Sequence, residues 1–453
     1  MAADAPVDIE TLIDERPLSA FQAWSIGLCA LVALLDGFDT LSIGFAAPPM
    51  SRSLGVTMSA FAPVFSAGLF GAMVGALALG AAADKLGRKV VLIVSTLLFA
   101  AFTFATAQSQ GMGDLILYRF MAGLGLGGAT PCFIALTTEY APARLRGRLV
   151  AAMWAAFPLG GVIGGFVNPV LLEQFGWRSL FYVGTVIPTV VAVILIVGLP
   201  ESLRFLIARG GDDGRVRRIV DRIAKGLPAD ARFVSRGPPA GGALLRSPFV
   251  TGRPLATVFL WAIFFCTFMM LAFMPLWVIS LMVHPGGLDV KGGALVVVMN
   301  TLGAAVGTAG LGRAFDRPDA TRFLMLTYLI GGAAIGGLGF TGDSLPAGAV
   351  LGFLGGFAIG GASGGAIALA ASLSPTAARS TGVGWSMAMG RLGQVIGPLI
   401  AGALLARAIG ANGIFPAIGL FGAVAAFCVF MLSGNTRRFG AQQSQADPGV
   451  PAA

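Results

Sequence analysis

Long uninterrupted apolar blocks, separated by short polar segments, make up most of the chain. Each block has about twenty or more mostly apolar residues, the length that a helix needs to cross about 30 Å of hydrocarbon. Strict alternation of apolar and polar positions is absent, which argues against a β-barrel. We expect an all-α polytopic membrane protein with twelve transmembrane helices, near residues 21–47, 59–82, 89–108, 114–138, 147–172, 177–199, 254–283, 291–312, 321–341, 347–372, 380–406 and 411–433.

The blocks form two sets of six on either side of a long polar stretch. This pattern predicts an N-terminal segment, a six-helix bundle, a basic linker, a second six-helix bundle and a C-terminal tail, at residues 1–20, 21–199, 200–253, 254–433 and 434–453. A weak repeat supports the division. GAAADKLGRKVVL at 80–92 and GRAFDRPDATRFL at 312–324 each have a glycine, an acid four residues later and then a base. Two related six-helix halves around a midplane site are a common transporter plan.

Charge is sparse and unevenly distributed. Only 11% of the residues are charged, against about 25% in a soluble domain. The net charge is +9, but the segments on the predicted inner side hold 24 of the 30 Lys and Arg, and the outer loops hold four. This positive-inside pattern predicts a cell inner-membrane protein with both termini in the cytoplasm, not a nucleic-acid partner. We expect the basic linker to be a solvated orienting loop; contact with the membrane surface is the alternative.

The residues that most enzyme sites need are scarce. Four cysteines lie far apart inside predicted spans, and the single histidine, His284, lies at the outer end of span 7. No spacing suggests a zinc site or a disulfide, and no nucleophile–base set is present. We therefore expect no metal, no cofactor and no enzymatic activity. The acidic start DIETLIDERP lacks the basic and apolar regions of a cleaved signal peptide.

Two acids interrupt the first apolar block. Asp36 lies about 22 Å into the span, and Asp39 lies one turn further along the same helix face. A charge at mid-membrane costs at least about 2.5–3.5 kcal/mol, so both acids need a polar cavity or a buried partner. Two like charges this close resist joint ionisation, and a carboxylate that holds a proton near neutral pH suits a proton-coupled carrier. The alternative is an ion pair or helix cap that only fixes packing.

Two arginines also fall within spans. Arg119, in span 4, lies at a depth that fits a pair with Asp39; contact with substrate is the alternative. Arg391 lies about 18 Å into span 11, with no acid near it in that span. Its planar guanidinium matches a carboxylate bidentately, so we expect it to bind an anionic substrate; an ion pair with an acid of the other half is the alternative. Neutral candidates for the same site are Asn300, Trp385 and Gln394.

The loop after span 2 has a pattern that suits a gate. Gly80 allows close approach of helices, Gly87 turns the chain, and Asp84 can cap or pair at a helix end. Lys85 adds positive charge, and pairing of Arg88 and Lys89 across the seam between the halves in one conformation, with release in the other, would give a switch. Gly-x-x-x-Asp-Lys-x-Gly-Arg-Lys resembles the signature loop of the major facilitator superfamily.

Two further charged positions lie at the inner ends of spans. Glu139 ends span 4 close in sequence to Arg144 and Arg146, so we expect a cytoplasmic gate network there. Arg379 begins span 11 and is either a gate residue or a contributor to the positive-inside charge. In span 5 the order is Pro-Leu-Gly at 158–160, so the Gly-Pro signature of drug antiporters is absent or broken.

Two segments are similar to one family within that superfamily. LLDGFDTLSIGFAAP in span 1 and ARSTGVGWSMAMGRLGQVIGP in span 11 resemble the signatures of the aromatic acid:proton symporters, and the similarity runs from about residue 9 to 433. The resemblance implies that Asp36 and Asp39 serve coupled uptake and that Asp84 serves the conformational cycle. It also implies that Arg379 and Arg391 are important for transport. A monomer is the usual state of the superfamily.

These observations together predict proton-coupled import of a small aromatic carboxylate, in the hydroxybenzoate or benzoate class, by alternating access. One alternative is a carrier of another organic acid, of the muconate or nicotinate type. A second is a proton-driven exporter. A third is a transporter-like receptor, which would need a sizeable soluble output domain; the longest loop has only about fifty residues.

Overall fold

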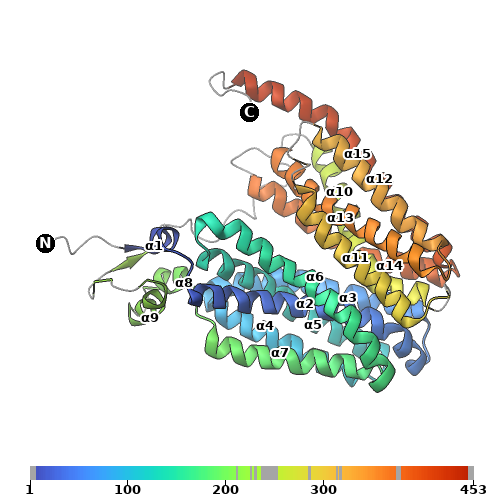
Figure 1. The fold of residues 1–453 in the computed structure, drawn as a ribbon, viewed down its shortest axis with the longest axis horizontal. Coiled ribbons are helices and arrows are strands. Elements are labelled where there is room, and N and C mark those ends of the chain that lie inside the picture. Colours follow the sequence, from blue (N-terminus) through green and yellow to red (C-terminus); the bar gives the residue numbers. More distant parts are fainter. Residues whose placement is uncertain are drawn as a thin grey trace. The chain divides into compact units, whose positions relative to one another are not determined.

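Helices make up almost all of the computed structural model (Figure 1). The structure describes residues 7–210, 213–224, 227–228, 232–235, 254–283, 287–312, 315, 319–373 and 379–446. Within these ranges twelve helices are long and apolar enough to cross a membrane, which confirms the all-α polytopic prediction. His284 and the pair Asp316 and Arg317 of the sequence repeat lie outside the described residues.

The long helices lie close to the predicted spans. In the N-terminal half they are α2 (Ala20–Leu54), α3 (Ala62–Leu86), α4 (Arg88–Ala107), α5 (Met112–Tyr140), α6 (Ala143–Phe175) and α7 (Arg178–Gly198). In the C-terminal half they are α10 (Pro254–Met282), α11 (Val290–Gly310), α12 (Ala320–Gly337), α13 (Leu345–Leu373), α14 (Arg379–Ala406) and α15 (Ala411–Ala446). Helix α2 continues past its predicted end near residue 47 to Leu54, and Pro48 and Pro49 lie inside it.

The chain divides into two compact units. The first contains Met1–Pro49 and Ala67–Ala240, and the second contains Met50–Ser66 and Gly241–Ala453. The second unit thus takes residues 50–66, which the sequence places in the first bundle. In this unit the Phe65 ring lies 5.4 Å from the Trp277 ring of α10, and Ser66 Oγ donates to the Val395 carbonyl of α14 at 2.7 Å.

Glycines set the packing of the first unit. An added Cβ at Gly71 of α3 would collide with the Phe120 carbonyl of α5, and one at Gly160 of α6 would collide with the Leu34 carbonyl of α2. Membrane helices lack a hydrophobic drive to associate, so small residues that let backbones touch are the main source of tight packing. The second span therefore packs on the fourth, and the first on the fifth.

The second unit repeats this scheme. An added Cβ at Gly356 of α13 would collide with the Asn300 carbonyl of α11, and one at Gly393 of α14 would collide with the Phe265 carbonyl of α10. Again the second span of the unit packs on the fourth, and the first on the fifth. The shared scheme is the structural counterpart of the repeat expected from the sequence.

A small subdomain, here called the cap, lies at one end of the first unit. It consists of α1 (Ile9–Glu15), α8 (Leu203–Ala208), α9 (Asp213–Ile223) and a parallel pairing of β1 (Val7–Asp8) with β2 (Phe233–Val234). We expected a polar N-terminal segment and a solvated loop here. The described part of the loop folds because it has an apolar helical stripe, and the stripe packs in one cluster with α1 and α8. We call the end of the unit that carries the cap the linker end.

Candidate functional site

A buried ion pair joins the first and fourth spans. Arg119 Nη2 of α5 lies 2.7 Å from Asp39 Oδ2 of α2, and Nη1 donates to Oδ1 at 3.1 Å. Only 2% of Asp39 and 5% of Arg119 is exposed. This bidentate contact is the pair that depth alone suggested. Direct contact of Arg119 with substrate stays a prediction.

The other acid of the first span has a different environment. Asp36 lies one turn before Asp39 on α2 and is half-buried. Its backbone carbonyl accepts a hydrogen bond from Thr40 Oγ1 at 2.9 Å. The sequence predicts both acids on one helix face. Side chains three residues apart point about 60° from each other around the helix, so the two acids share a face but not the same surroundings. The structure thus combines a fully buried, paired acid with a more accessible acid beside it.

Contacts on both sides of Asp39 hold α2 in position. Two residues before it, Gly37 packs against the Phe157 carbonyl of α6. One turn after it, Ser42 Oγ lies 3.2 Å from Asn168 Nδ2 of α6, and 0% of Asn168 is exposed. Asn168 was not predicted from the sequence. Its sequence position could have indicated a buried contact, because an amide in an otherwise apolar block is costly unless it is hydrogen-bonded.

The candidate anion site of the second unit lies on α14. Arg391 is half-buried, and its Nη1 donates to Gln394 Oε1 at 3.2 Å. An arginine has five N–H donors, and this contact uses one of them and orients the guanidinium plane. The structure therefore brings together two of the residues predicted to bind substrate. Arg379 begins the same helix, and its side chain lies outside the described residues.

Two other predicted substrate residues have structural contacts. The Trp385 ring lies 6.2 Å from the Trp261 ring of α10, with 32° between the planes. Six residues separate Trp385 from Arg391, which is about 240° around a helix, so the two side chains leave α14 on different faces. Asn300 Nδ2 donates to the Gly352 carbonyl at 3.1 Å and ties α11 to α13. Contact of either residue with substrate stays a prediction.

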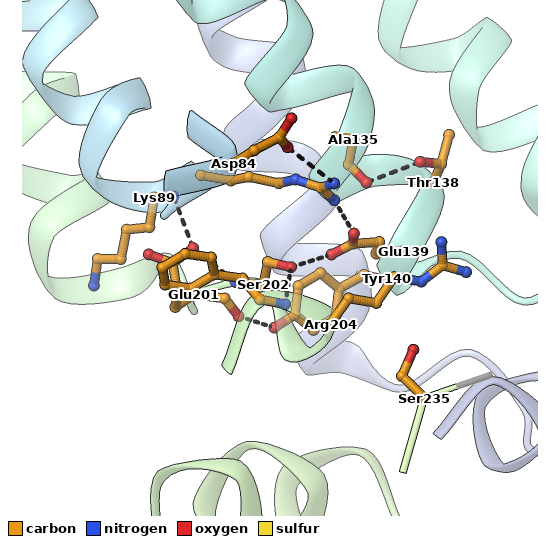
Figure 2. Close-up of polar contacts among 12 residues, drawn as sticks. Asp84, Lys89, Ala135, Thr138, Glu139, Tyr140, Glu201, Ser202, Arg204 and Ser235 are labelled. Carbon is orange, nitrogen blue, oxygen red and sulfur yellow. Dashed lines mark hydrogen bonds and ion pairs between the residues drawn. The ribbon is translucent and has the colours of Figure 1, made fainter. Parts of the chain in front are cut away.

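A charged network occupies the linker end of the first unit (Figure 2). Arg88, at the start of α4, forms an ion pair with Glu139 at the end of α5, and its Nη2 lies 4.0 Å from Asp84 Oδ1. Ser202 Oγ donates to Glu139 Oε2 at 2.6 Å. The expected network at Glu139 therefore uses Arg88. The nearby Arg146 instead lies 3.9 Å from Asp14 of the cap.

Glu201, which was not predicted from the sequence, also belongs to this network. Its Oε1 accepts from the Lys89 backbone N–H at 3.0 Å, and its carbonyl accepts from Tyr140 Oη at 2.6 Å (Figure 2). Gly87 precedes α4 with φ of 101°, and an added Cβ there would collide with the Glu201 carboxylate. Only glycine adopts this conformation readily. The sequence contains one indication of Glu201: it is an acid that directly follows the sixth apolar block, at the same end as the loop after span 2.

Two more residues of the loop pattern have defined places. An added Cβ at Gly80 of α3 would lie 3.1 Å from Pro131 Cγ of α5, so this glycine lies at a close helix approach as expected. Lys85 is exposed, and its backbone carbonyl accepts from Arg209 Nη2 at 2.6 Å. The hydrogen bond from Arg209, the residue after α8, ties the turn between α3 and α4 to the cap.

Comparisons with known proteins agree with this architecture. A family model described as Major Facilitator Superfamily matches residues 29–344 and 287–451. The chain is 36% identical over 439 residues to the 4-hydroxybenzoate transporter PcaK of Acinetobacter baylyi, with 94% of each chain covered. It is 33% identical over 438 residues to the gallate transporter of Pseudomonas putida, with 96% of each covered. A solved structure of the xylose transporter XylE from E. coli has the same fold, with a TM-score of 0.69 at 17% identity, covering 91% of this chain and 98% of that one.

Proposed function

The chain belongs to the major facilitator superfamily, and we propose that it imports a small aromatic carboxylate together with protons. Members of this family are multi-pass membrane transporters, so the chain is a transporter and not an enzyme. The hydroxybenzoate or benzoate class of substrate is supported by relatives more than 30% identical that are named for 4-hydroxybenzoate and gallate. The observation that carries proton coupling is the buried pair of Asp39 and Arg119 with Asp36 one turn away.

The acids of α2 supply a route for coupling. Ionised Asp39 holds Arg119 by two charge-assisted hydrogen bonds, and a proton on Asp39 would weaken both. Asp36, which is more accessible, is positioned to exchange protons with its surroundings. Acids inside a span are costly and commonly belong to proton relays. Protonation would thus change how α2 is held to α5.

The substrate's carboxylate would bind to the second unit. Arg391 presents a planar fork of donors, and Gln394 orients it. A bidentate arginine recognises a carboxylate by geometry as well as by charge, which separates an aromatic acid from a neutral aromatic compound. Apolar side chains of the long helices would accommodate the ring, since binding sites for small molecules are mostly apolar with a few convergent polar groups.

Transport would proceed by alternating access through movement of the two six-helix units. We place the linker end in the cytoplasm, with both termini, because most basic residues lie on that side. We place the protein in the cell inner membrane, as a monomer. The network of Asp84, Arg88 and Glu139 would hold one conformation, and its ion pairs would break in the other.

Uptake of labelled aromatic acids into proteoliposomes tests the proposed substrate. A panel of 4-hydroxybenzoate, benzoate, gallate, nicotinate, muconate and the amide of 4-hydroxybenzoate would be compared with empty liposomes. We expect saturable uptake of one or more of the benzoates and none of the amide. Saturable uptake of muconate or nicotinate alone would replace the proposed substrate class, and uptake of none would contradict it.

A further inference from the structure

Helix α9 of the cap has one apolar and one basic face. Val216, Val220 and Ile223 are buried, at 2%, 1% and 8% exposed, in a cluster with α1 and α8. Arg218 and Arg222 are exposed on the other side, four residues apart, and Arg215 is exposed one turn before Arg218. Residues three and four apart share a helix face. The three arginines therefore form one basic row, which we call the α9 row.

Three acids of the cap, Glu10, Asp14 and Asp221, have partners within the first unit. Glu10 Oε1 lies 3.0 Å from Arg204 Nε and accepts from Ser235 Oγ at 2.7 Å. Asp14 Oδ1 accepts from the Ala143 backbone N–H at 2.6 Å. Asp221 pairs with its helix neighbour Arg217, at 3.1 Å. Among the described side chains of α9, the exposed ones are the three arginines and Asp221, which pairs with Arg217, so positive charge dominates this face.

Helix α9 lies at the level where spans enter the membrane. Arg222 Cζ is 5.4 Å from the ring centroid of Phe21, in the first turn of α2. Trp24, one turn further, is 53% exposed and lies beside Gly198, the last residue of α7. Exposed tryptophans at span ends mark the boundary between hydrocarbon and headgroups. Figure 1 likewise shows α9 beyond the end of α7.

We propose that the α9 row binds anionic phospholipid headgroups of the leaflet at the linker end. An exposed row of arginines, the pairing of Glu10, Asp14 and Asp221 with other groups and a position near the span ends all favour a negatively charged lipid surface. The apolar face of α9 is covered by the cap, so the contact is electrostatic and the helix does not insert. Lipid binding would steady the cap, and with it the turn between α3 and α4 that Arg209 holds. This inference does not depend on the transported substrate.

Hydrogen–deuterium exchange of the full-length protein in nanodiscs tests the proposal. Discs of phosphatidylcholine alone would be compared with discs that also contain phosphatidylglycerol. One basic residue near an anionic surface changes affinity about five-fold. We expect exchange of α9 amides to slow about ten-fold or more in the anionic discs, and the effect to disappear in high salt, which shortens the screening length to about 3 Å. Equal exchange in both discs would overturn the proposal.

Variants separate the arginine row from the general charge of the protein. Arg218→Gln/Arg222→Gln should lose most of the lipid effect, and Arg218→Lys/Arg222→Lys should keep it. The matched control is Arg148→Gln/Arg322→Gln, which removes the same charge from two exposed arginines outside the cap; it should behave as wild type. If the glutamine substitutions already change α9 exchange in discs of phosphatidylcholine alone, the lysine variant tests the proposal instead, because it keeps both charges. Full lipid protection in an intact glutamine variant, or equal protection by free phosphate, would contradict lipid binding by this row.

Discussion

Asp39 and Arg119 illustrate what single residues reveal before a structure exists. Their depths along two apolar blocks were enough to predict the pair, because a charge inside a membrane needs a partner and few charges are available. Asn168 and Glu201 were not predicted. A neutral amide or an acid at a span end has many possible partners, and only the folded chain selects one.

The buried pair predicts a non-additive stability pattern. Asp39→Asn leaves the Arg119 charge buried without its carboxylate, which should cost about 3–5 kcal/mol. Arg119→Gln should cost a similar amount, but Asp39→Asn/Arg119→Gln should cost less than the sum of the two. Thermal unfolding of the purified variants in detergent checks this. Additive losses would mean that the two side chains do not stabilise each other.

Arg391 is the residue on which substrate recognition depends most. Lysine keeps the charge and loses the two-pronged geometry, so Arg391→Lys should weaken binding of the acid about ten-fold, and Arg391→Ala about a hundred-fold. The amide of the same acid should bind weakly to all three proteins and change little. Calorimetry on each protein with both ligands makes the comparison. Equal losses for acid and amide would leave Arg391 with a structural role only.

At the scale of elements, the apolar blocks predicted the twelve spans because the bilayer accepts little besides helices. The helix pairing followed less directly. Glycines mark the close approaches, but their sequence positions do not say which helix they approach. The cap was missed because charged residues are frequent in α9 and conceal its short apolar stripe of Val216, Ile219, Val220 and Ile223.

The seam between α2 and α6 gives a test with an internal control. Gly160→Ala places a methyl group against the Leu34 carbonyl, so the helices must separate, at a cost of about 1–3 kcal/mol. Gly147→Ala is on the same helix with nothing within 4 Å, so it should be neutral or slightly stabilising. Melting temperatures of the two variants check this. Equal melting temperatures would mean that the seam tolerates a side chain.

At the scale of the molecule, the sequence predicted two six-helix halves, and the structure divides into two compact units with the same pairing of spans. The repeat was readable because the second span of each half is followed by a glycine, an acid four residues later and then a base. The assignment of residues 50–66 to the second unit was not readable, because a contact with α14 leaves no periodic signal in that segment.

Asp84 links the linker-end network to the transport cycle. Asp84 is exposed and lies in the last turn of α3, away from Asp36 and Asp39 of α2. Its Oδ1 lies 4.0 Å from Arg88 Nη2. Asp84→Ala should therefore slow substrate counterflow in proteoliposomes several-fold with little change in equilibrium affinity. Asp114→Ala, at the first turn of α5 and the other end of the unit, should leave both unchanged. A large loss of affinity with normal counterflow would contradict a role in the cycle.

Substrate accumulation under an imposed proton gradient tests the central claim most directly. Proteoliposomes with an acidic exterior would be followed for labelled 4-hydroxybenzoate and, with an internal dye, for pH. We predict accumulation above the external concentration with simultaneous acidification of the interior, and only equilibration in Asp36→Asn at normal protein levels. Extrusion of substrate under the same gradient, or accumulation that does not respond to it, would contradict proton-coupled import.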